Sequence, residues 1–134
     1  MKGTEIIDVK TTTRSEMIDI TALVRGAIRK SGVSSGLACV FCPHTTAGIT
    51  LQENTNPAVK RDVIAHLNTL VPVDGGYQHA EENSDSHIKS TLVGASVTLI
   101  IDNGRPVFGT WQAVYFCEFD GPRSRRVLIR VVPD

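Results

Sequence analysis

A polar stretch at residues 79–87, with the letters HAEENSDSH, limits the possible fold of this chain more than any other feature. It holds two imidazoles, three carboxylates, one amide and two hydroxyls beside a single small apolar residue. Such a composition forms neither a core strand nor the apolar face of an amphipathic helix. Ser84 or Asp85 is suited to cap a short helix beginning near His87, because a side-chain oxygen accepts hydrogen bonds from first-turn amides. We therefore predict a site at an exposed helix N-terminus, where those amides favour an anion.

The length and charge of the chain exclude several classes of protein. Its 134 residues suffice for one sizeable core and are too few for two ordinary domains, so we expect a single domain over residues 1–134. The 14 basic and 14 acidic residues cancel, which removes the overall field that would attract nucleic acid or an anionic membrane. No window approaches the roughly eighteen apolar residues of a membrane span, and residues 1–5 lack a signal sequence. We expect a cytoplasmic protein with no nucleic-acid or membrane partner.

The hydrophobic pattern predicts two long helices. One is capped by Asp19 or Thr21, carries apolar residues at spacings of three and four, and ends at Gly32. The other begins with Pro57 at its first helical position and ends before Pro72. Both helices are expected to serve as scaffold, because their apolar stripes are suited to cover a sheet.

Apolar runs between turn residues predict the strands. A hairpin turn is expected at Asn103-Gly104 and a tight turn at residues 120–123. The order of the elements shows no alternation of strand and helix that would indicate a parallel sheet. The predicted fold is therefore α+β: a mainly antiparallel β-sandwich of about seven strands with two long helices and one short helix. The clearest strand runs are residues 4–12, 37–41, 49–52, 97–101, 107–119 and 126–132.

Three of the four histidines lie in polar, turn-like surroundings. Together His44, His79 and His87 could form an open metal site, because three neutral imidazoles leave one coordination position of a zinc ion for water or substrate. Neighbouring Glu81 or Asp85 would then serve as a general base or would orient a ligand. The alternative is that these histidines face water, since their spacings of 35 and 8 residues form no diagnostic motif.

Residues that could hold a phosphorylated small molecule occur near the same stretch. Arg123 follows Pro122, which makes the turn rigid, and its planar guanidinium can donate two parallel hydrogen bonds to a phosphate. Its expected partners are Ser84 and the amides near His87. Further candidates for substrate contact are Thr45, Asn83 and Gln112.

Other arginines compete for the same role. Arg125 and Arg126 enter a strand, where neighbouring side chains point to opposite faces, so only one of the two can face the site. Arg105 lies beside the Asn103-Gly104 turn and is the alternative place for an anion.

Five short motifs follow one another along the chain: HTTAG at 44–48, EN at 53–54, NSDSHIK at 83–89, GTWQ at 109–112 and EFDGPR at 118–123. These motifs resemble those of the YjbQ family, the secondary thiamine-phosphate-synthase-like proteins. The resemblance implies an α+β homotrimer, a metal-binding cluster at His44, His79 and His87 near the subunit boundaries, and a weak thiamine-phosphate synthase activity. The family usually has a glycine and an alanine where this chain has Glu82 and Ser86. If that glycine adopts a positive φ, Glu82 in its place is strained.

Two functional hypotheses follow from the residues and the resemblance. The first is a metal-dependent transferase with thiamine-phosphate synthase activity, which joins a pyrimidine pyrophosphate to a thiazole phosphate and releases pyrophosphate. Asp85 and Glu81 would be its catalytic carboxylates. Imidazole ligands favour zinc as the divalent metal, whereas a pyrophosphate leaving group favours magnesium. The alternative is a binding protein that holds a phosphorylated small molecule without chemistry.

Overall fold

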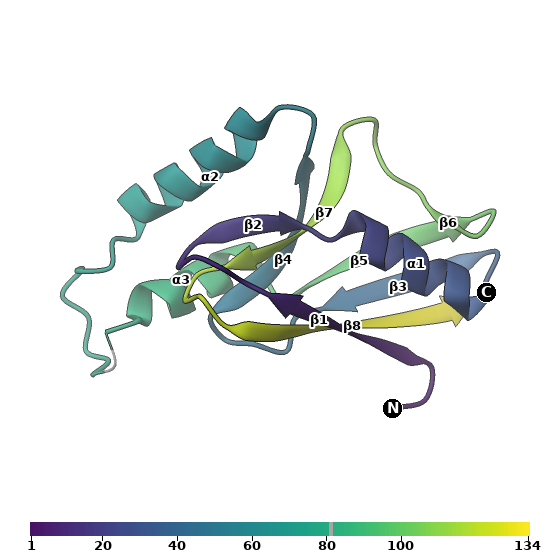
Figure 1. Ribbon diagram of the computed structural model, residues 1–134, viewed down its shortest axis with the longest axis horizontal. Coiled ribbons are helices and arrows are strands. Elements are labelled where there is room, and N and C mark those ends of the chain that lie inside the picture. The colour runs from purple at the N-terminus through teal and green to yellow at the C-terminus, as the bar shows by residue number, and fades with distance from the viewer. Residues whose placement is uncertain (81) are drawn as a thin grey trace.

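The computed structural model describes residues 1–80 and 82–134, which form eight strands and three helices (Figure 1). Glu81, one of the two predicted catalytic carboxylates, lies outside the described residues. No helix in the described part of the chain is long and apolar enough to cross a membrane. The helices are α1 (Thr21–Ser31), α2 (Pro57–Leu70) and α3 (Ser84–Val93). The strands are β1 (Thr4–Lys10), β2 (Glu16–Asp19), β3 (Gly36–Phe41), β4 (Ala47–Glu53), β5 (Ser96–Asp102), β6 (Arg105–Pro106), β7 (Gln112–Glu118) and β8 (Ser124–Pro133).

The strands form two antiparallel sheets, with the order β1-β8-β3-β5-β6 in one and β2-β7-β4 in the other. The predicted α+β class with antiparallel sheets is thereby confirmed. The predicted count of about seven strands was too low for the described residues, because β2 has 4 residues and β6 has 2, too few to show a pattern. The division into two long helices and one short one was wrong, since α3 has 10 residues and α1 has 11.

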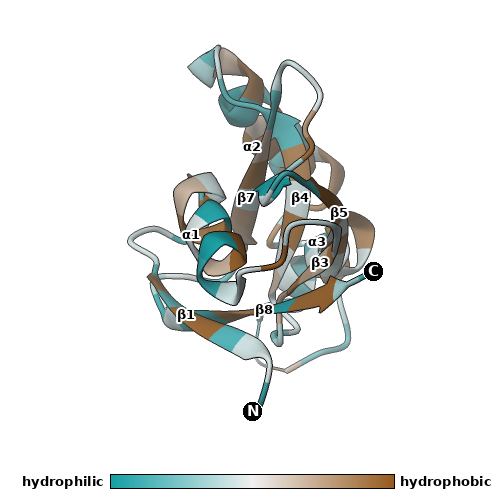
Figure 2. Ribbon diagram, turned by 90° about the vertical axis from the view of Figure 1, so that its right-hand side faces the viewer, coloured by the Kyte–Doolittle hydropathy of each residue, from teal (hydrophilic) through white to brown (hydrophobic). Residues whose placement is uncertain are grey.

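The main core lies between the two sheets and α1. Val24 and Ile28 of α1 belong to one buried cluster with Val40 and Ile129 from the five-stranded sheet and Phe116 from the three-stranded sheet. Figure 2 shows α1 between β8 and β7. The helix and the three-stranded sheet therefore cover the same, inner face of the five-stranded sheet.

A second buried cluster lies on the other face of the three-stranded sheet. It contains Tyr115 and Phe119, against which Val63 and Leu67 of α2 and Val93 of α3 pack. Strand β7 is thus covered on both faces. Helix α2 has no buried residue of its own, and Figure 1 shows it standing away from the five-stranded sheet.

Both predicted scaffold helices are present, but the predicted cap of α1 at Asp19 or Thr21 was wrong. The N-cap residue is Ile20, which makes no side-chain capping hydrogen bond, while Asp19 before it accepts from the Thr21 N–H at 2.9 Å. Gly32 ends α1 as expected, with a left-handed φ of 71°. The Asn56 side chain accepts from the Ala58 N–H at 3.0 Å and starts α2. The signals at Gly32, Asn56 and Pro57 were sufficient to predict where α1 ends and where α2 begins.

Helix α3 starts earlier than the sequence indicated. Its first residue is Ser84, and Asn83 occupies the N-cap position without a side-chain capping hydrogen bond. The predicted cap at Ser84 or Asp85 was therefore wrong, because Asp85 is a buried residue of the first turn that binds basic side chains instead. The first-turn amides are left without side-chain acceptors from the cap.

Small and hydroxylated residues hold α3 against the three-stranded sheet. The Ser90 hydroxyl donates to the Ala47 carbonyl at 2.7 Å, and the Ser86 hydroxyl donates to the Phe119 carbonyl at 2.5 Å. Gly48 permits this approach, because a Cβ there would lie 2.6 Å from the carbonyl oxygen at the end of α3. The N-terminus of α3 is thereby fixed beside the end of β7 and the turn that follows it.

Candidate functional site

The three predicted metal-binding histidines have different surroundings. The rings of His79 and His87 meet edge to face with their centroids 5.4 Å apart, and both line a cavity of about 380 Å³ with Tyr77 and Ser84. His44 lies on the loop before β4, where its Nε2 accepts a hydrogen bond from the Arg126 N–H at 3.0 Å. Burial and the nearby positive charge of Arg125 lower the pKa of His44. The lone pair that a metal would need is occupied in His44.

The predicted metal centre was wrong for the described chain. Among the described residues, no group of three or more His, Cys, Asp or Glu side chains is placed to hold a metal ion. The reason is topological: His44 is held against β8, whereas His79 and His87 contact each other at α3. The described residues do not test the choice between zinc and magnesium.

A buried ion pair joins the end of β7 to the start of β8. Glu118 is fully buried, and its carboxylate accepts from Arg125 Nε at 2.9 Å, from the Thr11 hydroxyl at 2.7 Å, and from the next two backbone amides at 3.1 and 3.2 Å. Arg125 also donates to the Thr46 hydroxyl at 2.8 Å. Because the pair is well supplied with hydrogen bonds, its burial is tolerated. It is a rigid support for the turn at residues 120–123.

A second buried charge pair lies within α3. Asp85 and Lys89 have relative exposures of 0% and 1%, and Lys89 Nζ lies 3.1 Å from Asp85 Oδ2. Lys89 also donates to Asn68 Oδ1 at 2.8 Å. The second carboxylate oxygen of Asp85 accepts from Arg14 Nη2 at 3.0 Å. The buried pair therefore reaches the surface through Arg14.

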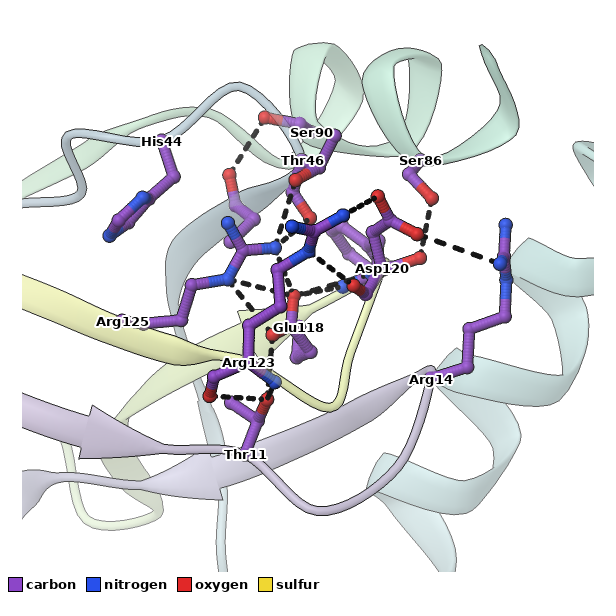
Figure 3. Close-up of polar contacts among 12 residues, drawn as sticks. Thr11, Arg14, His44, Thr46, Ser86, Ser90, Glu118, Asp120, Arg123 and Arg125 are labelled. Carbon is purple, nitrogen blue, oxygen red and sulfur yellow. Dashed lines mark hydrogen bonds and ion pairs between the residues drawn. The ribbon is translucent and has the colours of Figure 1, made fainter. Parts of the chain in front are cut away.

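Asp120 links the turn after β7 to this pair (Figure 3). Its carboxylate binds Arg123 at 2.9 Å, Arg14 at 3.5 Å and the Asn83 amide at 2.9 Å. Partial burial raises the pKa of Asp120, but the hydrogen bonds from Asn83 and Arg123 and the charges of Arg123 and Arg14 outweigh it and leave the pKa below its usual value. Asp120 is thus an anion that holds two arginines in place.

These contacts form one continuous polar network at the N-terminus of α3. Its basic members outnumber its carboxylates among the described residues, four to three. Oδ1 of Asn83 is, in the same described set, the one buried side-chain polar atom without a hydrogen-bond partner. The excess positive charge and the helix N-terminus together suit a bound anion. The bases are Arg14, Lys89, Arg123 and Arg125, and the acids are Asp85, Glu118 and Asp120.

The network contains some of the predicted site residues and leaves others outside. Asn83, Asp85 and Arg123 are members, and Ser84 lines the cavity beside them. Thr45 is exposed on the loop that carries the predicted ligand His44.

Gln112 lies at the far end of β7. It is about 20 Å along the strand from Glu118, and it accepts from the Gly109 N–H at 2.8 Å. This distance separates it from the polar network.

Four network members were not among the predicted site residues: Arg14, Lys89, Glu118 and Arg125, the last considered only as a competitor of Arg123. For two of them a signal was available, because strand alternation places Arg125 on the face of the buried Val127 and Glu118 on the face of the buried Phe116. A charge on an apolar strand face needs a buried partner. Lys89 follows Asp85 by one helical turn, but that spacing gives no sign of burial. Arg14 lies between β1 and β2 and carries no local signal.

Comparison with known proteins decides the family. The family model described as "UPF0047 protein YjbQ-like" matches residues 5–134. The chain belongs to this family. A UPF0047 protein of Methanocaldococcus jannaschii is 49% identical over 126 residues, which cover 94% of this chain and 91% of that protein. YugU of Bacillus subtilis is 47% identical over 127 residues, which cover 94% of this chain and 96% of YugU.

Solved structures agree with the YjbQ fold. A crystal structure of an uncharacterized YjbQ/UPF0047 protein from Clostridium acetobutylicum has a TM-score of 0.94 at 50% identity and covers 96% of this chain and 99% of that chain. A YjbQ-like protein from Sulfolobus solfataricus has the same TM-score of 0.94 at 28% identity, with coverage of 98% and 96%.

These relatives correct the functional prediction. They are named as UPF0047 or YjbQ proteins, and the Sulfolobus protein is described as one of unknown function. None of these names carries a thiamine-phosphate synthase, a transferase or a metal-dependent activity. The predicted synthase was therefore wrong, and the predicted metal dependence also lacks a ligand group in the described residues. Membership in the YjbQ family is the part of the resemblance that is confirmed.

Proposed function

We propose that this YjbQ protein binds a small phosphorylated molecule at the N-terminus of α3, beside Arg14 and Arg123. The observation that carries this proposal is the charge of the polar network, in which four basic side chains meet three carboxylates among the described residues. A phosphate would compensate the excess positive charge and accept from the first-turn amides of α3.

Arg14 and Arg123 are the network members able to reach a ligand. Their side chains are 42% and 53% exposed, whereas those of Lys89 and Arg125 are 1% and 6% exposed. Arg123 donates Nε and Nη2 to Asp120, which leaves its other guanidinium N–H groups for a phosphate. Asp120 thus orients both arginines before a ligand arrives, and this lowers the entropy lost on binding.

A cavity at the first turn of α3 gives room for the uncharged part of the ligand, and none of the four bases of the network lines it. Its volume of about 380 Å³ suits a small organic molecule, and Ser84 with the edge-to-face pair of His79 and His87 forms its polar part. In this proposal Ser84 and Asn83 contact the phosphate. Asp85 acts by positioning Arg14, because Arg14 and Lys89 already occupy its two carboxylate oxygens.

We also propose that the protein assembles as a homotrimer, as the family resemblance implies. The outward face of the five-stranded sheet supports assembly, because two apolar rows cross it at cross-strand register positions. One row is Val132, Leu37 and Ile100, with exposures of 53%, 48% and 61%. The other contains Ile6 and Phe41, with exposures of 45% and 40%. Burial of both rows against other copies would remove apolar surface from water.

Isothermal titration with pyrophosphate at low salt tests the binding proposal. We expect saturable binding by the parent and a loss of about tenfold or more in Arg14→Gln, because one of two ligand-facing guanidiniums is removed. Arg61→Gln, which removes an exposed arginine from α2, should bind as the parent does. Absence of binding by the parent, or equal affinities of Arg14→Gln and Arg61→Gln, would contradict the proposal.

A further inference from the structure

A second basic cavity lies at the opposite end of β5 from α3. Its volume is about 760 Å³, and it is formed where the C-terminal half of α1 faces the β5–β6 hairpin. In Figure 1 this hairpin and α1 lie on the side of the molecule away from α3. Three arginines line the cavity, Arg25 and Arg29 from α1 and Arg105 from the hairpin. No carboxylate is among the lining residues in the described chain.

The three arginines have no counter-charge within the described residues. Arg29 and Arg105 form no ion pair or side-chain hydrogen bond there, and Arg25 lies over the Phe108 ring at 5.3 Å. Asp102 is the register partner of Arg105, but it neither lines the cavity nor comes within ion-pair distance. The cavity therefore has three positive charges that no carboxylate of the described residues compensates.

A purely structural role explains only part of this arrangement. A basic residue in the last turn of a helix stabilises the helix dipole, which accounts for Arg29. Arg25 lies one turn earlier on the same face, where two like charges four residues apart repel each other. Arg105 belongs to the β5–β6 hairpin. The Gly104 N–H of this hairpin donates a hydrogen bond to the Ser34 carbonyl at 3.0 Å and holds the hairpin beside the loop after α1. The arginines are thus brought together from two rigid elements despite their repulsion.

We propose that this cavity binds an organic molecule with two or more phosphate groups, of the nucleoside diphosphate class. Three guanidiniums suit more than one phosphate, because each guanidinium presents a planar pair of donors. The volume lies within the roughly 300–1,000 Å³ of small-molecule sites and exceeds what an inorganic anion fills. Val33, which is partly exposed, gives the cavity apolar wall for the uncharged part of the ligand. This site is independent of the one proposed at α3 and stands if that proposal fails.

Titration of the ¹⁵N-labelled protein with ADP, followed by NMR, tests the inference. We expect saturable shifts of the Gly32, Ser34 and Gly104 amides, and no shifts of these amides with adenosine, which lacks phosphate. ADP should bind more tightly than pyrophosphate, because only ADP has an uncharged part. Absence of shifts at these amides with millimolar ADP would overturn the inference, and equal affinities for ADP and pyrophosphate would overturn its assignment to an organic ligand.

Matched variants locate the phosphate contacts. Arg29→Gln and Arg105→Gln should each weaken ADP binding at these amides by about tenfold, because each removes a planar pair of donors. Arg61→Gln removes an exposed arginine from α2 and should bind as the parent does. Equal affinities of all three variants would overturn the proposal. Shifts of the Ser84 amide report separately on the α3 site.

Discussion

Arg14 and Asp85 are 71 residues apart in the sequence and form an ion pair of 3.0 Å at the first turn of α3. Asp85 is fully buried, while the Arg14 side chain is 42% exposed. The buried charge is thereby connected to the protein surface. Arg14 also lies 3.5 Å from Asp120, so a ligand that binds Arg14 would change the ion pairs of Arg14 with both carboxylates. The proposed ligand site therefore depends on Asp85, which holds Arg14 in place.

Asp85→Asn should lower the free energy of unfolding by about 3–5 kcal/mol, because it leaves the buried Lys89 charge without its partner. Urea unfolding measures this change. The double variant Asp85→Asn/Lys89→Met should lose less than the sum of the two single losses, since it removes both buried charges. Asp74→Asn, at an exposed loop position, is the control and should stay within about 0.5 kcal/mol of the parent. If Asp85→Asn is as mild as this control, the buried pair is not formed.

The pKa of His44 predicts a pH dependence of stability. Burial and Arg125 lower this pKa, so the unfolded chain binds the proton more readily than the folded chain does. Stability from the neutral imidazole is therefore present above the unfolded pKa of about 6.5 and is lost as the pH falls below it. Urea unfolding between about pH 7 and pH 5 should show a smaller loss for His44→Gln than for the parent. Parallel pH profiles of the two proteins would show that His44 is not held neutral by the fold.

Glu82→Gly should raise the free energy of unfolding by about 1 kcal/mol, because Glu82 has a left-handed backbone conformation that glycine adopts without strain. Its φ of 61° lies in the left-handed region, where a residue other than glycine is strained. Thermal or urea unfolding gives the measurement. Gln78→Gly, in the preceding loop, should instead lower the free energy of unfolding by a few tenths to about 1 kcal/mol. The same sign in both variants would exclude backbone strain at Glu82 as the cause.

Ile100→Lys should disrupt the proposed trimer, because it introduces a charge into the apolar row of the five-stranded sheet. Size-exclusion chromatography with light scattering is expected to give a trimer for the parent and a monomer for this variant. Thr69→Lys places the same charge on the exposed surface of α2 and should remain trimeric. A parent that is monomeric at micromolar concentration contradicts the proposed assembly.

The sequence predicted those features whose cause is local. The left-handed Gly32 and the pairing of Asn56 with Pro57 act within a few residues, and both are present in the fold. Alternation also predicted that Arg125 and Arg126 point to opposite faces, and Arg125 is buried while Arg126 is exposed. Such signals need no knowledge of the tertiary structure.

The remaining errors concern residues that are distant in the sequence. The convergence of His44 with His79 and His87 depended on the path of the chain, which holds His44 against β8 instead. Lys89 resembles a solvated helix residue until Asn68 and Asp85 are brought to its ammonium group. Burial of that charge follows from how α3 meets the three-stranded sheet. It is therefore a property of packing, and a local pattern does not contain it.

An NMR titration with pyrophosphate tests the central claim most directly. The claim is that the N-terminus of α3 and Arg123 surround a phosphate, so the Ser84 and Asp85 amides should shift with saturation in the parent. In Arg123→Lys the same amides should shift with an affinity about tenfold weaker, because a point charge replaces a planar pair of donors. The fold should be unchanged in this variant. If the Ser84 and Asp85 amides do not respond in the parent, or respond with equal affinity in Arg123→Lys, the anion does not bind between the N-terminus of α3 and Arg123.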